Sequence, residues 1–206
     1  MAGFLSGDLR LHAGYLDRAQ QVALATAISA ALRQAPLYRP RMPKSGKPLS
    51  VRMSNCGPLG WITDERGYRY QATHPETGAA WPPIPDVLVT AWIELAQYRD
   101  PPQACLINYY GADARMGLHQ DRDEEDLQAP LVSVSLGDTC LFRIGGTERR
   151  DPTRSFRLAS GDALVLRGSA RLAFHGVDRV FPRSSTLLPE GGRINLTLRR
   201  VTRTDR

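Results

Sequence analysis

Apolar residues recur at helical spacing in two segments of the first hundred residues. The first segment predicts a helix from Ala19 to about Gln34, with Asp17 placed to cap its N-terminus. Its apolar positions are Val22, Ala25, Ile28 and Leu32. The stretch PDVLVTAWIELAQY predicts a second helix. Its shared apolar face consists of Leu88, Ala91, Trp92 and Leu95. The segment between the two helices is dense in Gly and Pro, which predicts loops and short hairpins.

The pattern changes after Asp100 to short alternating runs separated by Gly and Asp turns. These runs are ACLINYY, LVSVSLG, TCLFRIGG, RSFRLASGDALVLRG, AFHGVDRV and RINLTLRRV. So many short strands in succession predict an antiparallel sandwich or jelly roll. We therefore expect an α+β fold with its helices first. Residues 1–100 form the leading part, and residues 101–206 form the β-rich core.

The last strand separates an apolar face from a polar one. Alternation places three apolar residues on one face, while the opposite face carries two guanidinium groups and an amide. The polar residues are Arg193, Asn195, Thr197 and Arg199. By the same alternation, Asn108 and Tyr110 share one face of the strand CLINYY. One interpretation is a strand whose polar side meets water. If both polar faces instead line the inside of a barrel, they form a pocket for a small anion held by arginine.

Composition narrows the classes of protein. The chain has 206 residues, which suits a single globular unit, and it contains no apolar run long enough to span a bilayer. Because no signal-peptide pattern is present, we expect a soluble cytoplasmic protein. The residues Cys56, Cys105 and Cys140 fit buried thiols rather than a disulfide framework. Lys and Arg number 27 against 21 Asp and Glu, and the resulting charge of +6 favours polyanionic partners such as nucleic acid.

Acidic residues are concentrated in the stretch GLHQDRDEEDLQAP. Here His119 and Asp121 are separated by one residue, so at the end of a strand they point the same way. A second imidazole comes from His175 in LAFHGV. Two histidines and one carboxylate form a facial triad that suits a ferrous centre and leaves three coordination positions open. The remaining acids, Glu124, Glu125 and Asp126, are interpreted as a solvated loop, as most charge runs are.

Two other classes of protein remain open at this level. A mononuclear zinc hydrolase also uses two histidines and an aspartate, although it has no use for paired arginines on a barrel strand. A non-catalytic nucleic-acid-binding jelly roll needs the basic charge and the aromatic residues but not the triad. Metal analysis separates the hydrolase from an iron enzyme. Removal of the triad residues identifies the binding module, because its binding of nucleic acid would not change.

Several motifs occur together in a characteristic order. They are CLINYY, LHQDRDE, APLVSVSLG, IGG, RRDP, SGDALVLRG, RLAFHGV and RINLTLR. In order and spacing, from about Ser50 to Arg199, the chain resembles the AlkB-type iron and 2-oxoglutarate dioxygenases, which repair alkylated nucleic acid. The resemblance implies a double-stranded β-helix (jelly roll) core with N-terminal helices and a nucleotide-recognition lid. The segment 39–50 matches poorly, so its role is open.

The resemblance also implies a role for each matching residue. The residues implied to bind Fe(II) are His119, Asp121 and His175. Those implied to hold 2-oxoglutarate are Asn108, Tyr110, Arg193, Asn195 and Arg199. Those implied to contact the substrate base are Asp123 and Arg149, with Trp61 and Tyr68 as aromatic residues of the lid.

The implied reaction is oxidative demethylation of N1-methyladenine and N3-methylcytosine. It consumes O2 and 2-oxoglutarate and releases succinate, carbon dioxide and formaldehyde. The expected partners are alkylated single-stranded or double-stranded DNA, with RNA as a further candidate, and the enzyme is expected to be a monomer that binds no membrane. A 2-oxoglutarate dioxygenase acting on a protein or lipid is the alternative.

Overall fold

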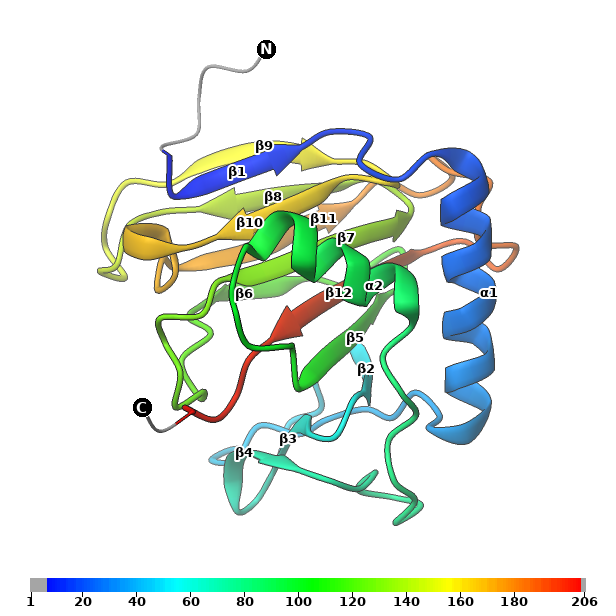
Figure 1. The fold of residues 1–206 in the computed structure, drawn as a ribbon, viewed down its shortest axis with the longest axis vertical. Coiled ribbons are helices and arrows are strands. Elements are labelled where there is room, and N and C mark those ends of the chain that lie inside the picture. The colour runs from blue at the N-terminus through cyan, green and yellow to red at the C-terminus, as the bar shows by residue number, and fades with distance from the viewer. Residues whose placement is uncertain (1–6, 205–206) are drawn as a thin grey trace.

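The computed structural model describes residues 7–204, in which two antiparallel β-sheets face each other and two helices lie outside them (Figure 1). The larger sheet has the strand order β1-β10-β7-β12-β5-β2. Its strands are β1 (Leu9–His12), β2 (Arg52–Cys56), β5 (Ala104–Tyr110), β7 (Leu131–Gly137), β10 (Ala163–Leu166) and β12 (Arg193–Arg199). Strands that are neighbours in this sheet lie far apart in the sequence, so long-range pairing builds the fold.

The smaller sheet has the order β6-β11-β8-β9. Its strands are β6 (Met116–His119), β8 (Cys140–Ile144), β9 (Arg154–Leu158) and β11 (His175–Val180). A short 3₁₀ turn, η2 (Gly168–Ala170), precedes β11. The two sheets enclose one cluster of buried residues, to which Leu106 and Leu164 of the larger sheet and Phe142 and Val177 of the smaller sheet belong. This arrangement is the jelly-roll core that the spacing of the strands predicted.

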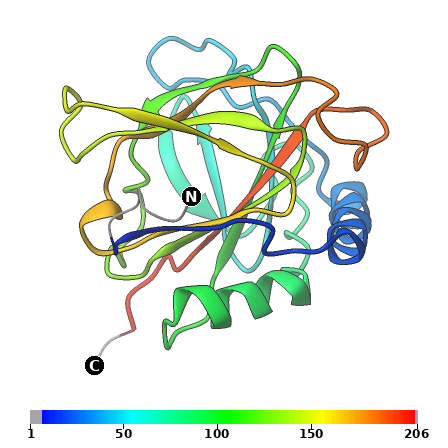
Figure 2. The same cartoon turned by 90° about the horizontal axis from the view of Figure 1, so that it is seen from above.

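The helices cover the outer face of the larger sheet, as Figure 2 shows from above. They are α1 (Arg18–Gln34) and α2 (Asp86–Ala91), which continues as a π-helix, η1 (Trp92–Ala96). A capping box starts α1: Asp17 accepts from the Gln20 amide at 2.8 Å, and the Gln20 side chain accepts from the Asp17 amide at 2.9 Å. Both predicted helices are therefore confirmed, including the buried positions Leu88, Ala91, Trp92 and Leu95.

The predicted apolar face of α1 is partly wrong. Its buried residues are Gln21, Leu24, Ile28 and Ala31, whereas Val22 is 47% exposed. Both sets recur at helical spacing, but the true face is rotated toward Leu24. Gln21 turns inward because its amide donates to the Leu16 carbonyl at 2.9 Å and accepts from the Ser160 hydroxyl at 2.8 Å. Two hydrogen bonds satisfy this buried amide, so a polar residue occupies a core position.

Strict alternation along the larger sheet separates the helix-covered core from the interior of the barrel. On β12, Ile194, Leu196 and Leu198 pack in the core beneath the helices. The intervening residues line a cavity between the two sheets. The hairpin of β3 (Gly60–Asp64) and β4 (Gly67–Gln71) forms a separate two-stranded sheet that contributes to this cavity. The division of the chain at residue 100 stays a prediction.

Candidate active site

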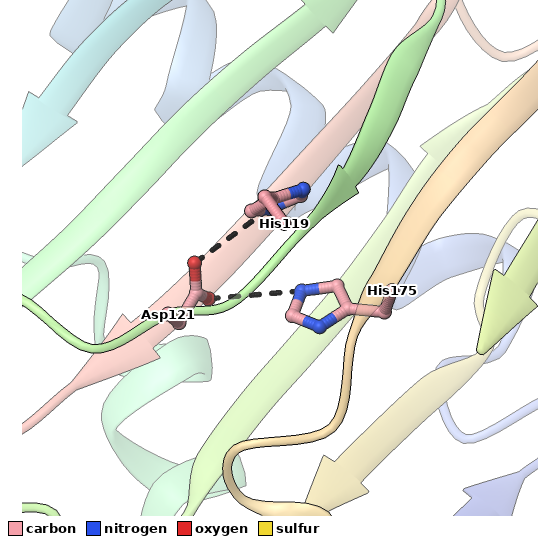
Figure 3. Close-up of side chains that lie close together, drawn as sticks. All are labelled: His119, Asp121 and His175. Atoms are coloured by element: carbon pink, nitrogen blue, oxygen red, sulfur yellow. Dashed lines mark ion pairs between the residues drawn. The ribbon is translucent and has the colours of Figure 1, made fainter. Parts of the chain in front are cut away.

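The side chains of His119, Asp121 and His175 converge at the end of the smaller sheet (Figure 3). Their potential ligand atoms all lie within 4.8 Å of one another. The Nε2 atom of His119 lies 3.7 Å from Asp121 Oδ1, and Nε2 of His175 lies 3.9 Å from Asp121 Oδ2. Two imidazole nitrogens and one carboxylate are the donor set of a facial triad, so these residues fit a ferrous ion.

Strand pairing explains why residues so distant in sequence meet. In the register of β6 and β11, His119 lies directly opposite His175, and their ring centroids are 4.6 Å apart. The strands approach closely beside the pair. A Cβ on Gly176 would lie 2.5 Å from the Met116 carbonyl oxygen, so glycine is required there. Asp121 follows β6 by two residues, which brings its carboxylate to the histidines.

Hydrogen bonds orient both imidazoles, and burial acts on His175. The Nδ1 atom of His119 lies 3.0 Å from the Gly117 carbonyl oxygen, and Nδ1 of His175 lies 2.9 Å from that of Ala173. We assign the ring proton to Nδ1 because it faces a carbonyl, which leaves the Nε2 lone pair for a metal. Burial, together with the neighbouring His119, lowers the pKa of His175 to about 4, so this imidazole is neutral at neutral pH.

The carboxylate of the cluster is stabilised in its charged form. Burial alone would raise the pKa of Asp121, but the charges of Arg199, His175, His119 and Arg171 together outweigh it and hold this pKa well below its usual value, with Arg199 contributing the most among them. Arg199 donates from Nη2 to Asp121 Oδ2 at 2.7 Å. Asp121 is therefore a charged carboxylate with a fixed orientation, as a metal ligand requires.

The cluster lies in a cavity of about 600 Å³ between the sheets. All twelve site residues predicted from the sequence line this cavity. Near the cluster are His119, Asp121, Asp123 and His175; from β5 and β12 come Asn108, Tyr110, Arg193, Asn195 and Arg199; from the hairpin and a loop come Trp61, Tyr68 and Arg149. The polar faces of β5 and β12 thus line the interior of the barrel, and the alternative of a water-facing strand is wrong.

The part of the cavity lined by β5 and β12 contains polar groups without protein partners. Arg193 is 1% exposed, donates from Nη2 to the Ser135 hydroxyl at 2.7 Å, and pairs with no carboxylate within residues 7–204. In the same range, its Nε atom and the side-chain oxygen of Asn108 have no hydrogen-bond partner. Burial raises the pKa of Tyr110, so its phenol stays a hydrogen-bond donor. A buried guanidinium that pairs with no carboxylate in residues 7–204, close to the Tyr110 phenol in the same cavity, fits a carboxylate ligand such as that of 2-oxoglutarate.

The Asn195 amide is already engaged within β7 and β12. Its side-chain oxygen accepts from the Ser133 hydroxyl at 2.7 Å, and its nitrogen donates to the Thr197 hydroxyl at 2.9 Å. Ser133 and Thr197 also line the cavity. The sequence interpretation missed these hydroxyls, although Thr197 lies on the polar face that it identified.

The part of the cavity lined by the β3–β4 hairpin is aromatic. Trp61 and Tyr68 stack with ring centroids 5.7 Å apart and an interplanar angle of 17°. The Trp61 indole donates to the Asp123 carboxylate at 2.7 Å. Arg149 donates to the Leu118 carbonyl at 3.1 Å, and its guanidinium lies 5.6 Å from the centre of the Phe174 ring. A flat aromatic surface next to a carboxylate suits a planar cationic group.

The acidic run, which consists of Glu124, Glu125 and Asp126, is only partly exposed to solvent. This corrects the interpretation of the run as a solvated loop. Glu125 is exposed, but Glu124 and Asp126 are 5% and 4% exposed. Glu124 Oε2 accepts from Arg171 Nη2 at 2.9 Å, and the Tyr98 hydroxyl donates to Asp126 at 2.9 Å. Arg171 was not identified from the sequence, and the compensation of charge by distant residues explains why the burial of Glu124 was missed.

A jelly roll that holds two histidines and an aspartate in a cavity with buried arginines defines the iron and 2-oxoglutarate oxygenase class. The chain belongs to the 2OG-Fe(II) oxygenase superfamily, which it matches over residues 8–199, and within that superfamily to the AlkB-type dioxygenases. It is an Fe(II)- and 2-oxoglutarate-dependent dioxygenase that uses O2.

Two curated relatives and one solved structure show the extent of the similarity. The alpha-ketoglutarate-dependent dioxygenase AlkB homolog of Caulobacter vibrioides is 58% identical over 188 residues, which cover 91% of this chain and 85% of the relative. The AlkB dioxygenase of Salmonella typhimurium is 42% identical over 170 residues, covering 80% and 77%. The structure of OsALKBH1 has a TM-score of 0.79 and 32% identity, and the match covers 96% of this chain and 98% of that one.

Across residues 7–204, none of the helices combines the length and apolar character that a bilayer span requires.

Proposed function

We propose that this dioxygenase removes N-linked methyl groups from bases of DNA, with N1-methyladenine and N3-methylcytosine as substrates and RNA as a second class of nucleic acid. The proposal depends on one observation: the stacked pair of Trp61 and Tyr68, with Asp123 beside it, shares a cavity with the His119, Asp121 and His175 cluster. A planar base that enters between them presents its methyl group to the metal site.

Residues of the barrel hold the co-substrate in this proposal. Arg193 binds one carboxylate of 2-oxoglutarate, because it is buried and lacks a carboxylate partner within the described residues. Asn108, Tyr110, Asn195 and Arg199 supply the remaining polar contacts. When bound at His119, Asp121 and His175, Fe(II) with 2-oxoglutarate and O2 supplies the oxidation of the methyl carbon. The protein positions the reactants and excludes water.

The part of the cavity lined by the β3–β4 hairpin selects the base. Both proposed lesions carry a methyl group on the pairing edge and a positive charge, and the methyl prevents normal pairing, so extrusion from the stack costs little beyond unstacking. Trp61 and Tyr68 cover a face of the extruded base. Asp123 favours its positive charge, and Arg149, which lines the same cavity, approaches the base.

A single chain supplies all of these side chains, so we infer that the enzyme acts as a monomer. Exposed arginine and lysine side chains hold phosphates on either side of the extruded base, which matches the net charge of +6. The salt dependence of oligonucleotide binding reports on these contacts.

The test is mass spectrometry of oligonucleotides that contain N1-methyladenine or N3-methylcytosine, incubated with the protein, Fe(II), ascorbate and 2-oxoglutarate. We expect a loss of 14 Da per lesion and an equivalent amount of formaldehyde, from the chemistry of demethylation. His175→Ala should abolish both signals, whereas His12→Ala, a substitution on β1 away from the cavity, should not. Release of formaldehyde from a methylated peptide but not from the oligonucleotides would favour the protein-directed alternative.

A further inference from the structure

We propose that Tyr70 is a positioning residue that couples the β3–β4 hairpin to the metal-binding carboxylate of Asp121 through Arg199. The proposal deepens the proposed function, because the same hairpin carries the aromatic pair that receives the base. The Tyr70 hydroxyl accepts from Arg199 Nη1 at 3.0 Å and donates to the Glu124 carboxylate. The Tyr70 hydroxyl therefore has two charged partners.

Arg199 connects this phenol to the metal cluster. Its Nη2 donates to Asp121 Oδ2 at 2.7 Å, while Nη1 lies 3.0 Å from the Tyr70 hydroxyl and 3.3 Å from Glu124 Oε1. Arg199 and Glu124 are 4% and 5% exposed, so water does not readily replace a lost partner. If the hairpin lifts, Nη1 keeps only the longer contact, and the guanidinium that orients Asp121 loses part of its support.

Arg171 fixes the far side of the network. It donates to Glu124 Oε2 at 2.9 Å, to the Asp121 carbonyl at 2.6 Å and to the Ala129 carbonyl at 2.8 Å. The two guanidiniums and the two carboxylates balance in charge, and the core holds all four. Among these contacts, Tyr70 is the member that comes from the hairpin, so movement of the hairpin would act on the network through the Tyr70 hydroxyl.

The geometry of the hairpin links Tyr70 to the base-binding surface. Trp61 lies directly opposite Tyr70 in the β3–β4 register, and Tyr68 lies two residues from Tyr70 on the same face of the strand. Tyr68 is 48% exposed, whereas the Tyr70 hydroxyl lies within the charged network. A base that stacks at the exposed end therefore acts on the strand that holds Arg199 at its buried end.

This arrangement predicts energetic coupling between base capture and metal binding, and by linkage the effect is reciprocal. Tyr70→Phe tests it, because the change removes one oxygen and keeps the ring. Tyr98→Phe is the matched control, since its phenol also donates to a buried carboxylate of the acidic run, Asp126, but has no contact with Arg199. Thermal unfolding of both variants establishes that they remain folded.

The first measurement needs neither turnover nor nucleic acid. In Tyr70→Phe, we expect amide hydrogen exchange of residues 60–71 to accelerate about threefold to tenfold, the factor for one lost hydrogen bond. Affinity for Co(II), a probe for the metal site, should fall by a similar factor. Tyr98→Phe should leave both at their wild-type values. Unchanged exchange and unchanged Co(II) affinity in Tyr70→Phe would overturn the proposal, whatever the substrate is.

The second measurement addresses coupling to the substrate. An N1-methyladenine oligonucleotide should tighten Co(II) binding to the wild type by about fivefold or more, the lower end of typical coupling factors, and by less than about twofold in Tyr70→Phe. Equal tightening in both proteins would refute the role of Tyr70 and leave the proposed function intact. If the oligonucleotide does not bind the wild type, the proposed function fails, and the first measurement still decides the role of Tyr70.

Discussion

Arg193 donates a hydrogen bond of 2.7 Å from Nη2 to the hydroxyl of Ser135, across neighbouring strands β12 and β7. This contact fixes a guanidinium that is 1% exposed and has no carboxylate partner in residues 7–204. Because burying a charge without a counter-ion is costly, we expect Arg193 to bind an anion.

Arg193→Lys keeps the charge but loses the planar fork that matches a carboxylate. We expect the KM for 2-oxoglutarate to rise at least tenfold, about 1.4 kcal/mol, while the KM for the oligonucleotide stays within about twofold. Succinate formation over a range of 2-oxoglutarate concentrations measures the change. Ser135→Ala, which keeps the guanidinium, should have a smaller effect. A rise confined to the oligonucleotide KM would place Arg193 on the nucleic-acid surface instead.

Trp61 and Asp123 should make separable contributions to substrate selection. Trp61→Ala removes the stacking surface, so binding of a methylated oligonucleotide should weaken by ~1–3 kcal/mol. Trp61→Phe keeps a ring but not the indole N–H that reaches Asp123, and it should lose less. Fluorescence anisotropy with labelled oligonucleotides measures both.

Asp123→Asn removes the negative charge at nearly constant size. It should reduce kcat/KM for the cationic lesions more than for an uncharged alkyl adduct, because only the cation gains from the carboxylate. Equal losses for charged and uncharged lesions would contradict an electrostatic role for Asp123. Competition between the two lesions in one reaction provides the ratio directly.

Asp17→Ala should destabilise the protein by about 1 kcal/mol, because the Gln20 amide loses its capping acceptor. For a domain of this size, that corresponds to a decrease in Tm of roughly 2–4 °C. Ser29→Ala, at an exposed interior position of α1, is the control and should leave Tm unchanged or slightly raised. Differential scanning calorimetry measures both shifts.

The three cysteines should resist modification in the native state. Cys56, Cys105 and Cys140 are buried and free, and burial raises the pKa of Cys56 to about 12. Because the thiolate is the reactive form, almost none is present at pH 7–8. We expect no labelling of the folded protein by iodoacetamide within an hour and three labels after denaturation. Rapid labelling of the native protein would show that a thiol is accessible.

Local sequence patterns determined most of the strands and the positions of their side chains. Period-two alternation in RINLTLR fixes which residues of β12 share a face, whatever the sheet packs against. The capping residues around α1 act within one turn, so Asp17 was identifiable from its neighbours. The strand β1 was missed because four residues carry too short a pattern to distinguish it.

Only the tertiary structure decided which of these faces became the site. The sequence allowed the polar face of β12 to meet water, and long-range pairing with β5 and β7 enclosed it in the barrel. The register that places His175 opposite His119 joins residues 56 positions apart, which no local pattern determines.

The acidic run shows most clearly which properties the sequence determines and which depend on the tertiary structure. A sequence of charges predicts solvation, because isolated buried charges are unstable. Glu124 is buried because Arg171, 47 residues away, and Tyr70, 54 residues away, converge on it. The sequence by itself therefore determined what each residue offers, in charge, hydrogen bonding and strand face. The tertiary structure decided which partners each residue meets, because the free energy of a buried charge depends on groups that only folding brings within reach.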